Sequence, residues 1–245
     1  MMRVLLVRGL WVGLVGGLLA LVVALVYGEP AVDSAIAYEQ QLAHAGGAHT
    51  EDAVVSRSMQ RTVGLGLAMA VYGLAFGGLF ALVFAGVSGR FTRFGPRGTA
   101  AVVALLGFVA VVLVPFLTYP ANPPGATDDA SVGTRTALYL VMVLVSGVAL
   151  VAAAVLARRL ASRYGAWNTT VLAAVAFVVV MAAVAWLLPA VDEAPGGFPA
   201  AVLYEFRMAT LGMHAVLWAT IGLLFGWLTE RSVRQRGRSA MMAAS

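Results

Sequence analysis

Residues 169–188 read TTVLAAVAFVVVMAAVAWLL and contain no ionisable side chain. An α-helix rises about 1.5 Å per residue, so about 20 such residues match the roughly 30 Å hydrocarbon core of a lipid bilayer. The stretch therefore predicts a transmembrane helix, and the rest of the chain decides whether this helix stands alone.

Most of the chain is similarly apolar. Of its 245 residues, 61% are hydrophobic and 11% are charged, which is more apolar surface than a soluble domain of this size can bury. Six apolar segments are separated by charges or prolines: 9–27, 63–87, 99–119, 136–157, 169–188 and 208–228. The sequence predicts an all-α integral membrane protein, a bundle of about six transmembrane helices. Its single transmembrane domain spans residues 1–230, with an outer loop at 28–62 and a basic tail at 231–245.

The first apolar segment, 9–27, follows MMRVLLVR and resembles a secretory signal peptide in that respect. Its apolar core is longer than that of a typical signal peptide, so we interpret it as a retained span. Each odd-numbered span is expected to end in a proline-bearing turn: YGEPAVD, TYPANPPGATDD and LPAVDEAPGGFP.

Charged residues are sorted between the two sides of the predicted bundle. Cytoplasmic loops are enriched in Arg and Lys, which orients membrane proteins. With the N-terminus inside, the inner segments contain twelve of the sixteen basic residues: Arg3, Arg8, Arg90, Arg93, Arg97, Arg158, Arg159, Arg163, Arg231, Arg234, Arg236 and Arg238. The outer segments then contain ten of the eleven acids: Glu29, Asp33, Glu39, Glu51, Asp52, Asp128, Asp129, Asp192, Glu193 and Glu205. Both termini are therefore predicted to be cytoplasmic, with an outer face that attracts cations.

Small and basic residues recur at fixed places in the spans. Glycines four residues apart, as in GLWVGLVGG (9–17) and YGLAFGG (72–78), favour close helix packing in lipid. Arg61, Arg135 and Arg207 open the even-numbered spans, where the helix dipole disfavours a cation. We expect these outer-rim arginines to pair with acids such as Asp52, Asp129 and Glu205, or to line an anion-selective mouth.

Enzyme signatures are missing. The chain has no cysteine, which excludes disulfides and thiolate chemistry, and it lacks phosphate-binding, zinc-protease and serine-hydrolase motifs. The net charge of +5 arises from the inner arginines, so it does not indicate nucleic-acid binding. We expect a protein that is not an enzyme.

Five residues are candidate metal ligands. His44 and His49 flank a glycine pair and precede Glu51 and Asp52, a flexible set of nitrogens and carboxylates that suits weak capture of a divalent cation. The alternative is an ordinary polar linker. His214 lies inside the last span, where an ionisable side chain is either functional or bonded to a neighbouring helix.

Several stretches resemble the CbtA family of predicted bacterial cobalt transporter subunits. They are GLVGGLLALVVALVYGEPAVDSAIAYE (13–39), VSRSMQRTVGLGLAMAVYGLAFGGLFALVFA (55–85), VPFLTYPANPPG (114–125), RTALYL (135–140), ARRLASRYGAWN (157–168), LLPAVDEAPGGFPAAVLYEFRMATLG (187–212) and VLWATIGLLFG (216–226). The resemblance implies a multi-pass protein of the bacterial cytoplasmic (inner) membrane that supports cobalamin synthesis by cobalt uptake.

The resemblance also implies partners and positions. Co²⁺ is the expected transported ion, with no tightly bound cofactor, and the expected partners are the lipid bilayer, a small single-span CbtB-like subunit and further copies of this chain. The matching motifs direct attention to an outer mouth made by Glu29, Asp33, Asn122, Asp192, Glu193 and Glu205. Two other functions stay open: a membrane scaffold or metallochaperone that presents cobalt without transporting it, and a carrier of an anionic solute that uses Arg61, Arg135 and Arg207.

Overall fold

The computed structural model describes residues 2–45, 56–90, 94–127, 129–191 and 197–244. Every regular element in these ranges is helical, as predicted. Six of the helices are long and apolar enough to cross a membrane: Met2–His44, Arg57–Val87, Pro96–Thr118, Ser131–Tyr164, Ala166–Leu187 and Ala200–Arg236. Each predicted span lies within one of these helices or extends one residue beyond it, so the six-helix interpretation is confirmed.

The first three long helices each contain a π-helical turn, written η. The first consists of α1 (Met2–Val23), η1 (Ala24–Gly28) and α2 (Glu29–Ala45). The second consists of α3 (Arg57–Met59), η2 (Gln60–Gly64) and α4 (Leu65–Val87). The third consists of α5 (Pro96–Phe108), η3 (Val109–Leu113) and α6 (Val114–Thr118). The remaining helices are α7 (Asp129–Tyr164), α8 (Ala166–Leu187) and α9 (Ala200–Ala244).

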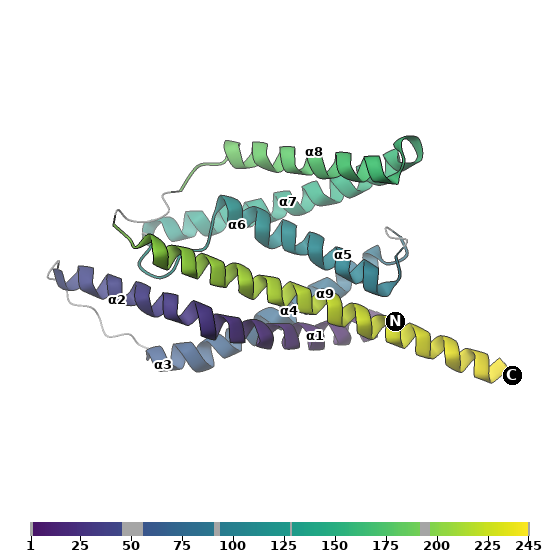
Figure 1. Cartoon of the computed structure of the whole chain (residues 1–245), viewed down its shortest axis with the longest axis horizontal. Coiled ribbons are helices and arrows are strands. Elements are labelled where there is room, and N and C mark those ends of the chain that lie inside the picture. The colour runs from purple at the N-terminus through teal and green to yellow at the C-terminus, as the bar shows by residue number, and fades with distance from the viewer. Residues whose placement is uncertain (1, 46–55, 91–93, 128, 192–196, 245) are drawn as a thin grey trace.

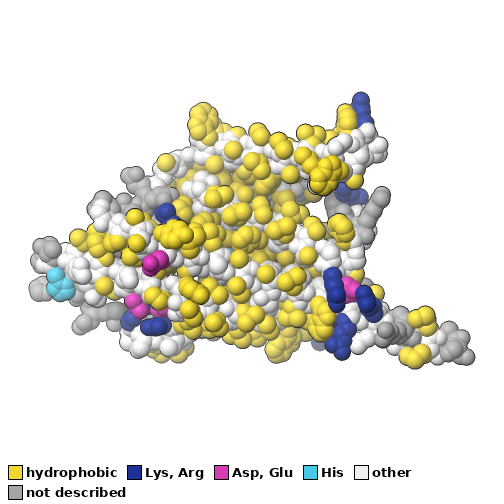
Figure 2. Space-filling model, in the orientation of Figure 1, with side chains coloured by type: hydrophobic (Ala, Val, Ile, Leu, Met, Phe, Trp, Pro, Cys, Tyr) yellow, Lys and Arg dark blue, Asp and Glu magenta, His cyan; other side chains and the backbone are white. Residues whose placement is uncertain are grey.

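The helices lie side by side along the long axis of the molecule (Figure 1). Both termini and the turns α4–α5 and α7–α8 lie at one end, which we call the terminal end. The opposite end, with the end of α2, the α6–α7 connection and the start of α9, is the distal end. Charged side chains gather near the two ends, and an apolar belt covers the middle (Figure 2). This distribution is that of a chain that crosses a bilayer.

Glycines set the packing at the centre of the bundle. A Cβ atom added to Gly13 would lie 2.1 Å from the carbonyl oxygen of Gly73, and one added to Gly77 would lie 2.1 Å from that of Gly9. The backbones of α1 and α4 are therefore in direct contact, as the glycine spacing predicts. On the other side, α9 packs against α1 and α5 through Leu217, Ile221 and Phe225.

Freed backbone carbonyls attach α7 to the third long helix. In η3, the amide of Val114 bonds to the carbonyl of Val109, which leaves the carbonyl of Ala110 without its usual helical donor. Pro115 has no amide hydrogen for the carbonyl of Val111. The Ser146 hydroxyl donates to Ala110, and the Tyr139 hydroxyl donates to Val111 at 3.2 Å. Two side chains of α7 thus donate hydrogen bonds to backbone carbonyls for which lipid offers no donor.

Two of the long helices continue beyond the predicted spans. The outer loop 28–62 is helical in its first half, because α2 continues the first long helix as far as Ala45. Pro30 does not end that helix: it follows η1, where the amide of Glu29 bonds to the carbonyl of Ala24 and the wider winding accommodates the proline. The basic tail 231–245 is likewise helical, since α9 extends to Ala244.

Candidate functional site

Two carboxylates and two arginines meet at the distal end, on α2, α3 and η2. Arg57 Nη2 donates to Glu29 Oε2 at 2.6 Å and to Asp33 Oδ1 at 3.0 Å. Arg61 approaches the same two acids, with Nε 3.7 Å from Glu29 Oε2 and Nη1 3.6 Å from Asp33 Oδ2. We call these four residues the distal charge cluster. Its formal charges cancel.

Glu29 is the buried member of the distal charge cluster. Its side chain is 7% exposed, whereas that of Asp33 is 47% exposed. A carboxylate in such a place stays ionised only if partners replace the water it has lost. The α2 helix places Glu29 and Asp33 four residues apart on one face, so that Arg57 bridges both. The distal charge cluster therefore holds two neighbouring carboxylates, and both of them are bound by guanidinium groups.

His44 lies exposed in the last turn of α2. Its Nδ1 is 2.6 Å from the backbone carbonyl oxygen of Gln40, and because a carbonyl only accepts, Nδ1 carries the proton. The other ring nitrogen, Nε2, is then the one suited to bind a metal, an orientation common among metal-bound histidines. The other residues of this predicted metal-binding loop, His49, Glu51 and Asp52, lie outside the described residues.

The structure brings only part of the predicted mouth together. Glu29 and Asp33 share the distal charge cluster, and Glu205 is exposed in the second turn of α9. Asp192 and Glu193 lie outside the described residues. Within the described ranges, no three His, Asp or Glu side chains come together as a metal site.

Asn122 and two of the rim arginines hold the connection between α6 and α7. Arg207 donates to the backbone carbonyl of Ala121 at 3.3 Å and to Asn122 Oδ1 at 3.0 Å. Arg135 donates to the backbone carbonyl of Pro120. These bonds satisfy loop carbonyls near the membrane edge, and they give each arginine an acceptor at the positive end of its helix. The prediction that Asp52 pairs with a rim arginine falls on a residue outside the described ranges.

His214 packs among aromatic rings of α4 and α9. The Tyr72 hydroxyl is 3.5 Å from His214 Nδ1, and the ring centroids are 5.7 Å apart. Tyr72 in turn stacks obliquely on Phe76, which meets Trp218 edge-on. Of its two neighbouring methionines, Met208 is 42% exposed and Met213 packs against the core. These contacts favour a histidine bonded to a neighbouring helix.

Arg57 is the residue of this site that the sequence did not single out. It is the fourth of the arginines outside the predicted inner segments, beside Arg61, Arg135 and Arg207, and it makes the shortest contacts of the distal charge cluster. Its partner Glu29 is 28 positions away, beyond a segment outside the described residues. The sequence contains one relevant signal, which is Ser56 directly before Arg57. Serine is a common N-cap residue, and Ser56 caps the short helix α3, so that Arg57 stands at the first position of that helix.

Comparison with known proteins identifies the family. A family model described as a probable cobalt transporter subunit, CbtA, matches residues 2–230, which include five of the six apolar helices and most of the sixth. No curated protein and no solved structure matches the chain. Since the match covers nearly the whole sequence, this multi-pass membrane protein belongs to the CbtA family of probable cobalt transporter subunits.

Proposed function

We propose that the chain is the membrane subunit of a bacterial cobalt uptake transporter that supports cobalamin synthesis. In this proposal it lies in the cytoplasmic membrane with both termini in the cytoplasm, and its distal end faces outward and captures Co²⁺. The observation that carries the capture step is the buried carboxylate of Glu29, four residues from Asp33, in a chain of a cobalt transporter family.

The charge distribution supports this orientation. The terminal end contains Arg3, Arg8, Arg90, Arg97, Arg158, Arg159, Arg163, Arg231, Arg234 and Arg236 among the described residues, with Glu230 as its described acid. The distal end contains the acids Glu29, Asp33, Glu39 and Glu205, of which Glu29 is buried, and the arginines Arg57, Arg61, Arg135 and Arg207. Arginine-rich loops stay in the cytoplasm during insertion, so the larger number of arginines at the terminal end supports the orientation.

Capture then proceeds by exchange of cations. The exposed His44 meets the metal first, together with Glu51 and Asp52, which follow it in the sequence. Arg57 and Arg61 occupy the inner carboxylates, so Co²⁺ binds Glu29 and Asp33 only as the guanidinium groups leave them. The two positive charges of Co²⁺ replace those of the two arginines, which keeps the buried carboxylate compensated. Arg57 and Arg61 thereby prevent weaker-binding cations from entering.

The contacts of the rim arginines argue against an anion carrier. Arg61 faces two carboxylates, and Arg135 and Arg207 are bonded to carbonyls of the α6–α7 connection. Each guanidinium thus has an acceptor from the chain itself. These contacts do not argue against the scaffold or metallochaperone alternative. The experiment must therefore distinguish cobalt binding from cobalt transport.

The test is uptake of radioactive cobalt by cells that express the chain, with and without a CbtB-like small subunit. We expect uptake that Glu29→Gln and Asp33→Asn each reduce at least tenfold. Glu39→Gln, an exposed acid of the same helix, is the matched control and should retain uptake. Cobalt binding without accumulation under either condition would establish the scaffold function in place of transport.

A further inference from the structure

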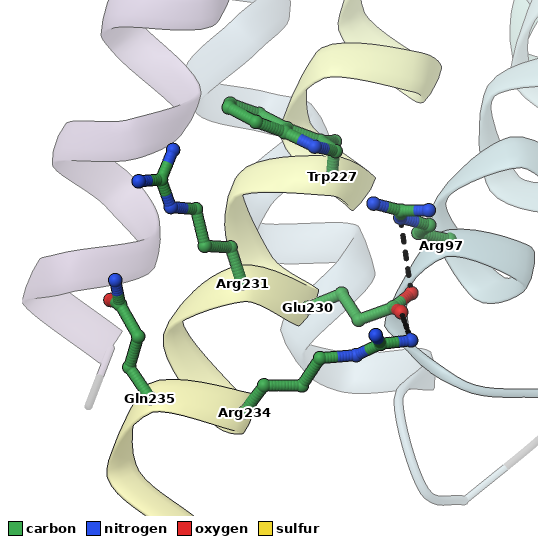
Figure 3. A pocket seen from close by; sticks show the side chains of 6 residues that line it. All are labelled: Arg97, Trp227, Glu230, Arg231, Arg234 and Gln235. Atoms are coloured by element: carbon green, nitrogen blue, oxygen red, sulfur yellow. Dashed lines mark hydrogen bonds and ion pairs between the residues drawn. The ribbon is translucent and has the colours of Figure 1, made fainter. Parts of the chain in front are cut away.

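The terminal end contains a basic hollow between the start of α5 and the end of the membrane-spanning part of α9. It has a volume of about 300 Å³ and is lined by Arg97, Trp227, Glu230, Arg231, Arg234 and Gln235 (Figure 3). The distal charge cluster lies at the opposite end of the bundle, so the proposed capture of cobalt does not use this hollow.

The hollow has a surplus of positive charge. Glu230 pairs with Arg97, whose Nε lies 3.2 Å from Oε2, and with Arg234. One carboxylate thus faces two guanidinium groups. Arg231 lies with its guanidinium carbon 5.4 Å from the centre of the Trp227 ring, a cation–π contact, and within the described residues it is not paired with Glu230. Three arginines and one glutamate give the site a formal charge of +2.

The start of α5 adds to this positive potential. Its first turn contains no acidic residue, and Arg97 stands where the helix dipole already disfavours a cation. A bound anion would supply the negative charge that the first turn of α5 lacks, and it would offset the repulsion between Arg97 and the helix dipole. Phosphate groups are suited to the site, because a guanidinium binds two phosphate oxygens with two parallel hydrogen bonds.

A second, apolar groove lies on the same two helices. It measures about 260 Å³ and is lined mainly by small or apolar residues of α5 and α9, among them Ala101, Ala104, Ala219, Gly222 and Leu223. Ala101 stands one turn after Arg97 on α5, and Leu223 stands one turn before Trp227 on α9. The polar hollow and the apolar groove therefore follow one another along the same pair of helices, which we call the seam.

The residues of the hollow are those expected at the level of lipid headgroups. Trp227 is 40% exposed and is followed one turn later by Arg231, and tryptophan prefers the interface between membrane and water. Basic sites between helices at the cytoplasmic side of a membrane bind anionic headgroups. A free phosphate would fill the hollow but leave the groove empty, whereas a phospholipid fills both.

We propose that the seam between α5 and α9 binds one anionic phospholipid, with its phosphate among Arg97, Arg231 and Arg234 and an acyl chain in the groove of Ala101 and Ala219. The lipid bridges the start of α5 and the exit of α9 from the bilayer. This proposal does not depend on the transported ion.

The test uses the full chain in mixed micelles and measures retained lipid by native mass spectrometry, with phosphatidylglycerol and phosphatidylcholine as probes. We expect phosphatidylglycerol to be retained preferentially, and Arg231→Gln to weaken its binding roughly fivefold. Arg159→Gln, an exposed arginine of α7 at the same end, is the matched control and should have no effect. Equal retention of the two lipids, or unchanged binding in Arg231→Gln, would overturn the proposal.

A second variant separates a lipid from a free anion. Ala219→Phe fills the groove without altering any charge, so it should reduce phosphatidylglycerol retention as strongly as Arg231→Gln. If Ala219→Phe retains the lipid fully while inorganic phosphate competes for the hollow, the site binds phosphate alone and the lipid assignment is wrong. The monodispersity of each variant in size-exclusion chromatography checks that it is folded.

Discussion

Glu29 occupies a position where an acid is costly. Its side chain is buried near the end of an apolar bundle, and Arg57 is its closest partner. Removal of one partner from a buried ion pair leaves the other charge uncompensated, which costs more than the pair itself contributes. Arg57 is partly exposed, so water offsets some of this cost. The same carboxylate becomes available for a metal once the guanidinium is gone.

We therefore predict opposite effects of Arg57→Gln with and without cobalt. In metal-free buffer the variant should be less stable than the wild-type chain, by about 1–2 kcal/mol. Added CoCl₂ should raise its unfolding temperature by more than it raises that of the wild type, because Glu29 and Asp33 are then free to bind. Thermal unfolding in detergent with and without CoCl₂ measures both effects. An equal cobalt-induced shift in the two proteins would contradict the exchange of Arg57 for the metal.

The two described histidines should behave differently. His44 is exposed with Nε2 oriented away from its backbone bond, whereas His214 is packed against Tyr72. We predict that His44→Ala weakens cobalt binding severalfold, and that His214→Phe preserves both binding and uptake. Isothermal titration with CoCl₂ and the uptake assay give the comparison. Loss of uptake in His214→Phe with normal folding would place His214 on the transport path instead.

At the scale of helices, the contact between α1 and α4 depends on the absence of side chains. A methyl group at Gly13 meets the carbonyl of Gly73, which is backbone and cannot rotate aside. We predict that Gly13→Ala lowers the free energy of unfolding by about 1–3 kcal/mol, as overpacking does elsewhere. Gly147→Ala in α7 has no atom within 4 Å and should be neutral or slightly stabilising. Titration with SDS measures both, and equal values for the two variants would refute the contact.

The attachment of α7 to η3 makes a second prediction at this scale. Ser146 and Tyr139 donate to carbonyls that the π-helical turn and Pro115 leave free. Interhelical hydrogen bonds in membrane proteins contribute on average about 0.6 kcal/mol each. We predict that the double variant Tyr139→Phe/Ser146→Ala loses about 1 kcal/mol in the same SDS titration. Tyr204→Phe on α9, where the side chain is 65% exposed, is the control and should lose nothing.

The elements show what hydropathy predicts and what it does not. Each apolar run had to be a helix, because a backbone in lipid must satisfy its own hydrogen bonds, so the six spans followed from the sequence. The continuation of the first helix past Pro30 did not, because a π-helical turn has no clear sequence signal. The glycine stripes predicted close packing, but not that Gly13 would face Gly73 rather than Gly222.

For the molecule as a whole, the candidate site was predicted in its residue types but not in its pairs. Glu29 and Asp33 were singled out because they lie in motifs that resemble the CbtA family, and Arg61 because it opens an even-numbered span. Their contacts with Arg57 depend on how α3 and η2 pack beside α2. The periodicity of the sequence does not predict that packing. Arg135 and Arg207 were expected beside acids, and that prediction falls in part on residues outside the described ranges. Their described hydrogen bonds, to loop carbonyls and Asn122, depend on the fold of residues 120–122.

Capture of cobalt for uptake requires that the distal end face the outside of the cell. The chain has no cysteine, so single cysteines are specific labels. Ser56→Cys marks the distal end, and Ser162→Cys and Ser239→Cys mark the terminal end. In intact cells without an outer-membrane barrier, a membrane-impermeant maleimide should label Ser56→Cys, and should label the other two only after permeabilisation. Labelling of Ser162→Cys and Ser239→Cys in intact cells, with Ser56→Cys protected, would contradict the proposed capture of cobalt at the distal end.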